Sequence, residues 1–178
     1  VGLPEHSTED VRRFVGNGVR KLMERAIDGG DNNPLFDTAY AIFRSHYLEH
    51  GLDTTLPYPG IMEMFAKLKA KGKNTAVVSN KFYDATQELV HHFFGKYVSV
   101  AIGERENRRK KPAPDTGIEA LKMLGVDKAD AVYIGDSDVD VNTAKNVGIP
   151  CISVLWGFRD KDFLTDCGAT TFISSPSE

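Results

Sequence analysis

The sequence has few cysteines, no long apolar run and no large excess of either charge, and each absence excludes a class of protein. Its two cysteines, Cys151 and Cys167, lack metal-binding spacing, so we expect reduced, packed thiols of the kind found in cytoplasmic proteins. No apolar run approaches membrane-spanning length, and Val1–His6 has neither the basic flank nor the apolar core of a signal peptide. The net charge of -3 gives no field for nucleic acid or an anionic membrane, so we expect neither partner.

The remaining composition is that of an ordinary folded domain. The 178 residues are 41% apolar and 26% charged, which is enough to bury a core in one domain with a small appendage. Apolar residues recur at helical spacing after Ser7 and again from Leu35 to His50. We therefore predict a helical hairpin without strands over the first fifty residues. No feature of the sequence predicts an oligomeric state.

The first predicted helix is interrupted at Gly16-Asn17-Gly18. Glycines inside a helix cost about 1 kcal/mol each relative to alanine. Two interpretations stay open at this point. The chain can break or cross another helix closely here, or its backbone N–H groups can approach a small anionic substrate.

A proline-rich connector, Thr54–Gly60, separates the hairpin from a different pattern. Short apolar runs then alternate with amphipathic segments. Strands are expected at 75–79, 98–102, 131–134, 151–155 and 170–173, and helices at 61–71, 114–124, 138–147 and 161–166, with one more around 89–94. This alternation predicts an α/β fold, a doubly wound parallel sheet with helices on both faces. The predicted division is an appended helical unit at 1–56 and a core at 57–178.

The stretch Ala131–Asp140 organises the predicted core. Its unbroken apolar run indicates a strand buried on both faces, and Gly135 then allows a sharp turn at the carboxyl edge of the sheet. Asp136 and Asp140 follow, with Asp138 placed to cap the next helix. Crowded carboxylates repel one another unless a lysine or a hard cation lies between them, and Mg²⁺ prefers such oxygen ligands.

A calcium loop is the first alternative for these acids. It is excluded because Val141 and Val147 stand where such a loop needs glycine and glutamate.

Two other strand ends carry polar residues. Ser79, Asn80 and Lys81 follow one apolar run, and the serine either caps the next helix or donates a hydrogen bond to a phosphoryl oxygen. No Gly-x-Ser-x-Gly motif supports a serine nucleophile. The basic run Arg108–Lys111 is either a solvated loop or presents Lys111, which Pro112 restrains, opposite the carboxylates.

The ordered set of Ser79, Lys111-Pro112 and Gly135-Asp136 followed by Asp140 resembles motifs two, three and four of the haloacid dehalogenase superfamily. The resemblance is strongest to the phosphoglycolate phosphatase-like branch and covers nearly the whole chain. Gly16-Asn17-Gly18 resembles part of the branch's helical cap. Pro57–Gly60 resembles the return from cap to core, and Trp156-Gly157-Phe158 resembles a late loop.

The resemblance implies a role for each motif. Ser79 would bond the transferring phosphoryl group, Lys111 would neutralise nucleophile and phosphate, and Asp136 would ligate Mg²⁺. Asp140 would support the metal or the lysine. Substrate contacts are implied for Gly16, Asn17, Gly18, Asn80 and Lys81. The implied activity is Mg²⁺-dependent hydrolysis of a small phosphorylated metabolite, first of all 2-phosphoglycolate, with pyrophosphate or sugar phosphates as alternatives.

One family element has no counterpart in the sequence. Family members begin with a strand that ends in Asp-x-Asp, whose first Asp forms the aspartyl-phosphate intermediate. That strand would lie between those carrying Ser79 and Asp136, and its absence would leave unpaired edges. We therefore expect an N-terminal segment outside this sequence and no turnover by the 178 residues alone.

Two alternatives to the phosphatase follow. One is a non-catalytic module that holds a phosphate ligand or a partner. The other is a response-regulator-like receiver, which does not account for the N-terminal helical hairpin.

Overall fold

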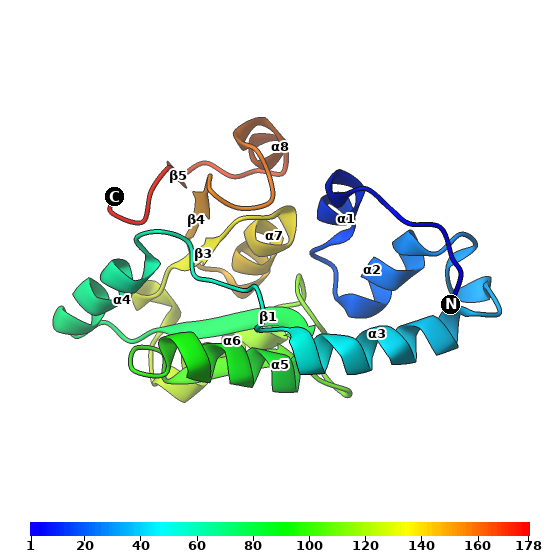
Figure 1. The fold of residues 1–178 in the computed structure, drawn as a ribbon. Helices are drawn as coiled ribbons and strands as arrows, with labels where there is room; N and C mark the ends of the chain where they lie inside the picture. Colours follow the sequence, from blue (N-terminus) through cyan, green and yellow to red (C-terminus); the bar gives the residue numbers. More distant parts are fainter.

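The computed structural model describes residues 1–178 and places three N-terminal helices beside an α/β part (Figure 1). The N-terminal helices form what we call the helical unit. It consists of α1 (Thr8–Phe14), α2 (Val19–Ala26), the 3₁₀ turn η1 (Gly30–Asn32) and α3 (Phe36–His50). The absence of strands from this region is confirmed, but the predicted hairpin of two helices is wrong because the first helix is split in two.

The split falls at the Gly16–Gly18 segment. Ser7 caps α1 as its sequence indicates, accepting a hydrogen bond from the Asp10 N–H at 3.2 Å. Gly16 and Gly18 then have φ values of +124° and +88°, which glycine adopts readily and other residues do not. These conformations end α1 and redirect the chain into α2, so the helix-break interpretation is confirmed.

The helical unit has its own small core. Five buried apolar residues from α2, from α3 and from the residue after α2 pack together: Val19, Met23, Ile27, Phe36 and Ala39. Phe82, at the end of a strand in the α/β part, packs against this cluster. The unit is therefore anchored to the sheet by apolar contact as well as by the chain.

The α/β part follows the irregular connector of residues 51–60. Its elements in order are α4 (Ile61–Ala70), β1 (Ala76–Phe82), α5 (Tyr83–Leu89), the π-helical turn η2 (Val90–Phe94), β2 (Val100–Glu104), α6 (Asp115–Leu124), the 3₁₀ turn η3 (Lys128–Asp130), β3 (Tyr133–Gly135), α7 (Asp138–Val147), β4 (Cys151–Val154), α8 (Lys161–Asp166) and β5 (Phe172–Ile173). Every strand pairing is parallel. The predicted α/β fold with parallel strands is confirmed.

Helices cover both faces of the sheet at β2. Val100 and Ile102 pack with Ala120 of α6. Gly103 faces α5, so closely that a Cβ on it would lie 2.5 Å from the Tyr83 Cα. Because successive side chains of a strand point to opposite faces, α5 and α6 lie on opposite sides of the sheet.

The parallel sheet is in two parts. β1 pairs only with β2, and β3 pairs with β4, which pairs with β5, so β1 and β3 each keep one unpaired edge. The expectation that the Ala131–Ile134 run is buried on both faces is wrong. Tyr133 is buried and β3 packs against α7, but Val132 and Ile134, whose side chains point to the opposite face, are 50% and 45% exposed.

Two expectations from composition can be compared with the fold. Cys151 and Cys167 are both free thiols, as expected. None of the helices combines the length and the apolar character needed to cross a bilayer.

Candidate active site

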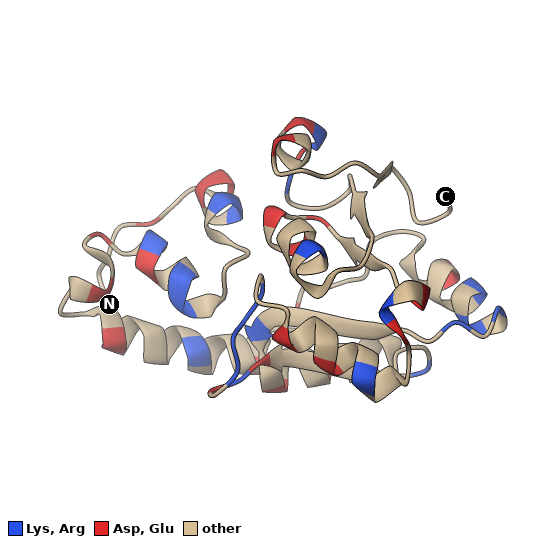
Figure 2. Ribbon diagram, turned by 180° about the vertical axis from the view of Figure 1, so that it is seen from behind, with Lys and Arg blue, Asp and Glu red and all other residues tan.

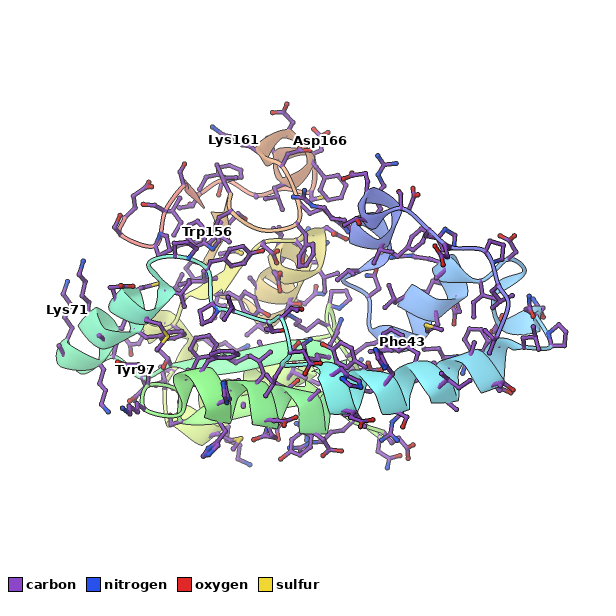
Figure 3. All side chains as sticks on the ribbon, viewed as in Figure 1. Phe43, Lys71, Tyr97, Trp156, Lys161 and Asp166 are labelled. Carbon is purple, nitrogen blue, oxygen red and sulfur yellow. The ribbon has the colours of Figure 1, made fainter.

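A cavity of about 390 Å³ lies between the helical unit and the α/β part. Its polar wall comes from residues in the carboxyl-terminal half of β1 and from residues in the segments that follow β2, β3 and β4. Its apolar wall includes Phe43 and Tyr47 of α3. Figure 3 labels Phe43 near the middle of α3. Ligands of parallel α/β folds bind at this carboxyl edge of the sheet. The site is therefore where the strand-end pattern predicts it.

The cavity gathers eight of the nine residues that the sequence proposed for the site. They are Gly16, Gly18, Ser79, Asn80, Lys81, Lys111, Asp136 and Asp140. The exception is Asn17, which does not line the cavity. Its Oδ1 accepts a hydrogen bond from Arg25 Nη2 at 2.8 Å, because the turn between the two glycines directs this side chain back onto α2. Asn17 is thus the one proposed site residue that the structure does not bring together with the other eight.

The buried carboxylate of Asp140 is the centre of a dense set of hydrogen bonds. Lys111 Nζ donates to Asp140 Oδ1 at 2.8 Å and to the Val78 carbonyl of β1 at 3.0 Å. Ser137 Oγ donates to Asp140 Oδ2 at 2.6 Å, and Tyr133 Oη lies 3.3 Å from Oδ1. We call Asp140, Lys111, Ser137 and Tyr133 the Asp140 network.

Charge pairing outweighs burial in this network. Burial by itself raises the pKa of Asp140, but the Lys111 ammonium and the hydrogen bonds from Lys111 and Ser137 hold it below its usual value. Burial by itself lowers the pKa of Lys111, but Tyr133 and Asp140 more than offset it and hold that pKa well above the usual range. Both groups are therefore charged at neutral pH.

Asn80 fixes the backbone of Lys111. Its Oδ1 accepts from the Lys111 N–H at 2.9 Å, and its Nδ2 donates to the Lys111 carbonyl at 3.0 Å and to the Gly16 carbonyl at 3.1 Å. The polar atoms of this buried side chain are thus used within the protein. Asn80 thus ties the lysine loop to the helical unit, and because it also lines the cavity its direct contact with a substrate stays a prediction.

All four basic residues of the Arg108–Lys111 run are paired within the chain. Figure 2 shows the loop between β2 and α6 in blue beside the helices. Arg108 pairs with Glu119, Arg109 with Asp115 at 2.8 Å, Lys110 with Glu104 at 3.8 Å, and Lys111 with Asp140. The side chains of Arg109 and Lys110 are 74% and 38% exposed, so this part of the run is a surface loop, whereas Lys111 is largely buried opposite Asp140.

Two charged residues of the cavity have no ion pair. Lys81 lies with its Nζ 4.6 Å from the centre of the Tyr47 ring, and burial lowers its pKa. Asp136 accepts a hydrogen bond from the Phe158 N–H at 2.8 Å, and burial raises its pKa, as does the charge of Asp140. We call Lys81 and Asp136 the unpaired charges.

Ser79 carries a hydroxyl proton that no protein group accepts. Its Oγ accepts a hydrogen bond from the Lys81 N–H at 3.1 Å and donates none. The sequence placed Ser79 at the end of the predicted strand, but β1 continues to Phe82, with a shift in its register against β2 between Val78 and Phe82. The serine therefore lines the cavity from within the strand and can donate to a ligand.

Two glycines let the acids approach the backbone. A Cβ on Gly135 would lie 2.2 Å from the Asp140 Cβ, and a Cβ on Gly157 would lie 2.3 Å from the Asp136 Cβ. No larger residue fits at either position without displacing a carboxylate. Gly135 was expected from the sequence as a turn, whereas no local pattern indicated a need for glycine at Gly157.

The sequence reasoning also missed several residues of the site. Ser137 could have been found from its position as the cap of α7, where it accepts from the Asp140 N–H. Phe158, Arg159 and Tyr47 carry no local signal of this kind. They reach the cavity only because the loop after β4 and helix α3 fold over it.

The carboxylates of the cavity provide some, but not all, of the ligands that a hard cation such as Mg²⁺ needs. No group of three or more His, Cys, Asp or Glu side chains gathers to hold a metal. Asp136 nevertheless offers a half-buried carboxylate without a cationic partner, close to a second acid, Asp140. Mg²⁺ is commonly held by one or two carboxylates together with water and substrate phosphate. The residues present fit that mode.

These features define an α/β protein whose ligand site lies at the carboxyl ends of parallel strands beneath a helical unit. The chain belongs to the haloacid dehalogenase-like hydrolase family, whose model matches residues 1–154. The family expected from Ser79, Lys111-Pro112 and Gly135-Asp136 is thereby confirmed.

Individual relatives place the chain within the phosphoglycolate phosphatase-like branch. It is 31% identical over 159 residues to the phosphoglycolate phosphatase of Aquifex aeolicus, covering 89% of this chain and 73% of the relative. It is 32% identical over 165 residues to phosphoglycolate phosphatase 1 of Pseudomonas aeruginosa, covering 89% of this chain but 60% of that protein. A crystal structure from Lactobacillus delbrueckii matches with a TM-score of 0.90 and 33% identity, over 97% of this chain and 81% of the other.

Proposed function

We propose that the protein is a Mg²⁺-dependent phosphatase of small phosphate monoesters, with 2-phosphoglycolate as the first substrate to test. One observation carries the proposal. One cavity of about 390 Å³ is lined by three groups of different chemistry. They are the Ser79 hydroxyl, which donates no hydrogen bond within the protein, the largely buried Lys111 ammonium, and the Asp136 carboxylate, which has no cationic partner. That set matches a phosphoryl group and a divalent ion.

Each of these groups has a distinct task in the proposed reaction. Ser79 donates its hydroxyl hydrogen to a phosphoryl oxygen. Lys111 offsets the negative charge of the phosphoryl group and of the attacking carboxylate, and Asp140 holds its ammonium in place. Asp136 would hold Mg²⁺, with Asp140 behind it. The metal would polarise the phosphoryl oxygens and neutralise charge.

The choice of substrate rests on Lys81 and on the similar proteins described above. The relatives from Aquifex aeolicus and Pseudomonas aeruginosa are both named phosphoglycolate phosphatases. 2-Phosphoglycolate carries a carboxylate beside its phosphate, and Lys81 is a half-buried cation of the cavity without an ionic partner. We assign to Lys81 the binding of that second negative group.

The nucleophile is proposed to be an Asp at the end of a further strand between β1 and β3. Support comes from the two unpaired strand edges. Backbone groups left unsatisfied cost about 1–3 kcal/mol each when buried, so a strand that pairs with both edges would stabilise the fold. The coding sequence upstream of Val1 tests this directly, since it should encode an apolar strand followed by Asp-x-Asp.

Residues 1–56 act as the cap in this proposal, and residues 57–178 as the core. The cap supplies Gly16, Gly18, Phe43 and Tyr47 to the cavity and limits access of water to it. Exclusion of water strengthens the charge interactions on which phosphoryl transfer depends.

The decisive experiment replaces Asp136 by alanine in the full-length protein, including any segment before Val1. We expect Mg²⁺-dependent hydrolysis of p-nitrophenyl phosphate to fall at least about 100-fold, because a metal contributes several kcal/mol to transition-state stabilisation. Asp138→Ala is the matched control. This acid lies two residues further on, at the start of α7, and does not line the cavity.

Undiminished turnover in Asp136→Ala would remove this residue from the mechanism. If the upstream sequence lacks Asp-x-Asp and wild-type protein hydrolyses nothing, the non-catalytic binding module replaces the phosphatase. Calorimetric titration with inorganic phosphate would then measure the ligand site.

A further inference from the structure

One peptide group connects the helical unit to the Asp136 carboxylate. The group joins Gly157 to Phe158 in the loop after β4. Its N–H, on Phe158, donates to Asp136 Oδ2 at 2.8 Å. Its carbonyl, on Gly157, accepts a hydrogen bond from Arg12 Nη2 of α1 at 2.9 Å. Because a peptide group is planar, its two hydrogen bonds are mechanically linked, and a shift at one end moves the other.

Arg12 donates hydrogen bonds to two successive carbonyl groups of this loop. Besides its contact with Gly157, its Nε donates to the Phe158 carbonyl at 3.2 Å. The guanidinium has no ion pair, so these two carbonyls are its hydrogen-bond partners. A planar guanidinium bound at two points fixes orientation as well as distance, which a single ammonium cannot do.

A second arginine crosses the same boundary in the opposite direction. Arg159 Nη1 donates to the Arg12 carbonyl and Nη2 to the Val15 carbonyl, both at 3.2 Å. These bonds attach the loop to the end of α1 but do not touch the Gly157–Phe158 peptide. The two arginines therefore separate two effects: Arg159 attaches the helical unit, whereas Arg12 also sets the peptide that bonds Asp136.

The packing around Asp136 makes its position sensitive to this loop. Gly157 lies so close to the Asp136 side chain that a Cβ there would overlap it. A hydrogen bond accepted by a peptide carbonyl polarises the group and strengthens donation by its N–H. Any loosening of the loop thus weakens the one backbone contact that Phe158 makes to the carboxylate.

We propose that Arg12 is a positioning residue that couples the docking of the helical unit to the orientation of the Asp136 carboxylate through the Gly157–Phe158 peptide. The consequence for activity rests on the proposed function, because it requires Asp136 to act in the phosphatase reaction. The coupling itself requires only the hydrogen bonds.

The test uses Arg12→Met, with Arg13→Met as its matched control. Arg13 is the next residue of the same helix, largely exposed and paired only with Glu9 at 3.4 Å. Hydrogen exchange of the Phe158 amide, followed by NMR in the full-length protein, reports the contact directly. We expect exchange to quicken about tenfold in Arg12→Met, as for the loss of about one hydrogen bond, and to stay at the wild-type rate in Arg13→Met. The buried amide of Ala144 in α7 should be unchanged in both variants, which shows that the core is folded.

Three further measurements separate positioning from simple docking. Arg12→Met should lower kcat about three- to tenfold with little change in KM, and raise the half-saturating Mg²⁺ concentration. Arg12→Lys should recover part of the loss, since one ammonium can bond the Gly157 carbonyl alone. Arg159→Met should loosen the helical unit, with a smaller effect on Phe158 exchange than Arg12→Met.

Unchanged Phe158 exchange in Arg12→Met would overturn the coupling. Equal effects of Arg12→Met and Arg159→Met on this amide would do so as well, because docking alone would then account for both. Faster exchange with unaltered turnover would overturn the positioning role of Arg12 in catalysis, whereas Asp136→Ala tests separately whether Asp136 acts in the proposed reaction.

Discussion

The Asp140 network and the unpaired charges lie on the same cavity wall but differ in how their charges are balanced. In the network, lysine and aspartate are buried together and each raises the stability of the other's charged form. Lys81 and Asp136 have no such partner, and burial shifts their pKa values toward the neutral form. Of these charged cavity residues, Lys111 and Asp140 are thus paired with each other, whereas Lys81 and Asp136 have no partner of opposite charge. Groups whose pKa values are shifted by burial often lie at functional sites.

The largest effect is expected from breaking the network at Lys111. In Lys111→Met, Asp140 is left as a buried carboxylate without a counter-charge, and we expect the free energy of unfolding to fall by about 3–5 kcal/mol. Urea denaturation measures the change. The double variant Lys111→Met with Asp140→Asn should recover much of the lost stability, because it leaves no buried charge without a counter-charge. A double variant as unstable as the single one would show that packing, rather than charge, accounts for the loss.

A smaller and more selective effect is expected at Lys81. A hydrogen bond to a charged group contributes about 1.5–3 kcal/mol, so Lys81→Met should raise KM for 2-phosphoglycolate about 10- to 100-fold. KM for p-nitrophenyl phosphate, which has no carboxylate, should change by less than about twofold.

Lys69→Met provides the control for Lys81, since Lys69 also lies over a tyrosine ring, 6.0 Å from the centre of Tyr97, but outside the cavity. Equal losses for both substrates in Lys81→Met would contradict the proposed carboxylate contact.

The smallest effect is expected for the stability of Asp136→Asn, and its sign is opposite to that of Lys111→Met. The folded state raises the pKa of Asp136, so the unfolded chain releases this proton first and wild-type stability falls as pH rises through the aspartate range. The asparagine side chain of the variant has no proton to release. The Asp136→Asn protein should therefore match wild type near pH 3 and become the more stable of the two above about pH 4–5. Thermal melts across this range measure the crossover, and a variant less stable at neutral pH would show that Asp136 is already balanced by a cation.

The local parts of the site could be predicted from the sequence because each depends on its own strand end. Apolar runs followed by Ser79 and by Gly135-Asp136 mark the carboxyl edges of two strands, and parallel strands bring such edges together. Lys111 was predictable because Pro112 restrains it just ahead of a helix. These residues line one cavity, as the pattern requires.

The hydrogen-bond partners of two proposed residues could not be predicted. The Asn17 side chain bonds Arg25 on the next helix, and the Asn80 side chain bonds Lys111 and Gly16, which lie far away along the chain. The predicted burial of the Ala131–Ile134 run on both faces was wrong, because Val132 and Ile134 are half exposed on the face opposite Tyr133. None of these outcomes has a local signal.

The sequence by itself determined the alternation of strands and helices, the break at Gly16–Gly18 and the chemical groups of the cavity, since periodicity, glycine and side-chain chemistry act over a few residues. Only the tertiary structure decided which charges are paired and which stay free. It also decided that Arg12, on the first helix and far from Asp136 along the chain, contacts the peptide that bonds this carboxylate. Pairing depends on distances of about 3 Å between segments far apart in sequence, and those distances exist only after the helical unit has packed onto the sheet.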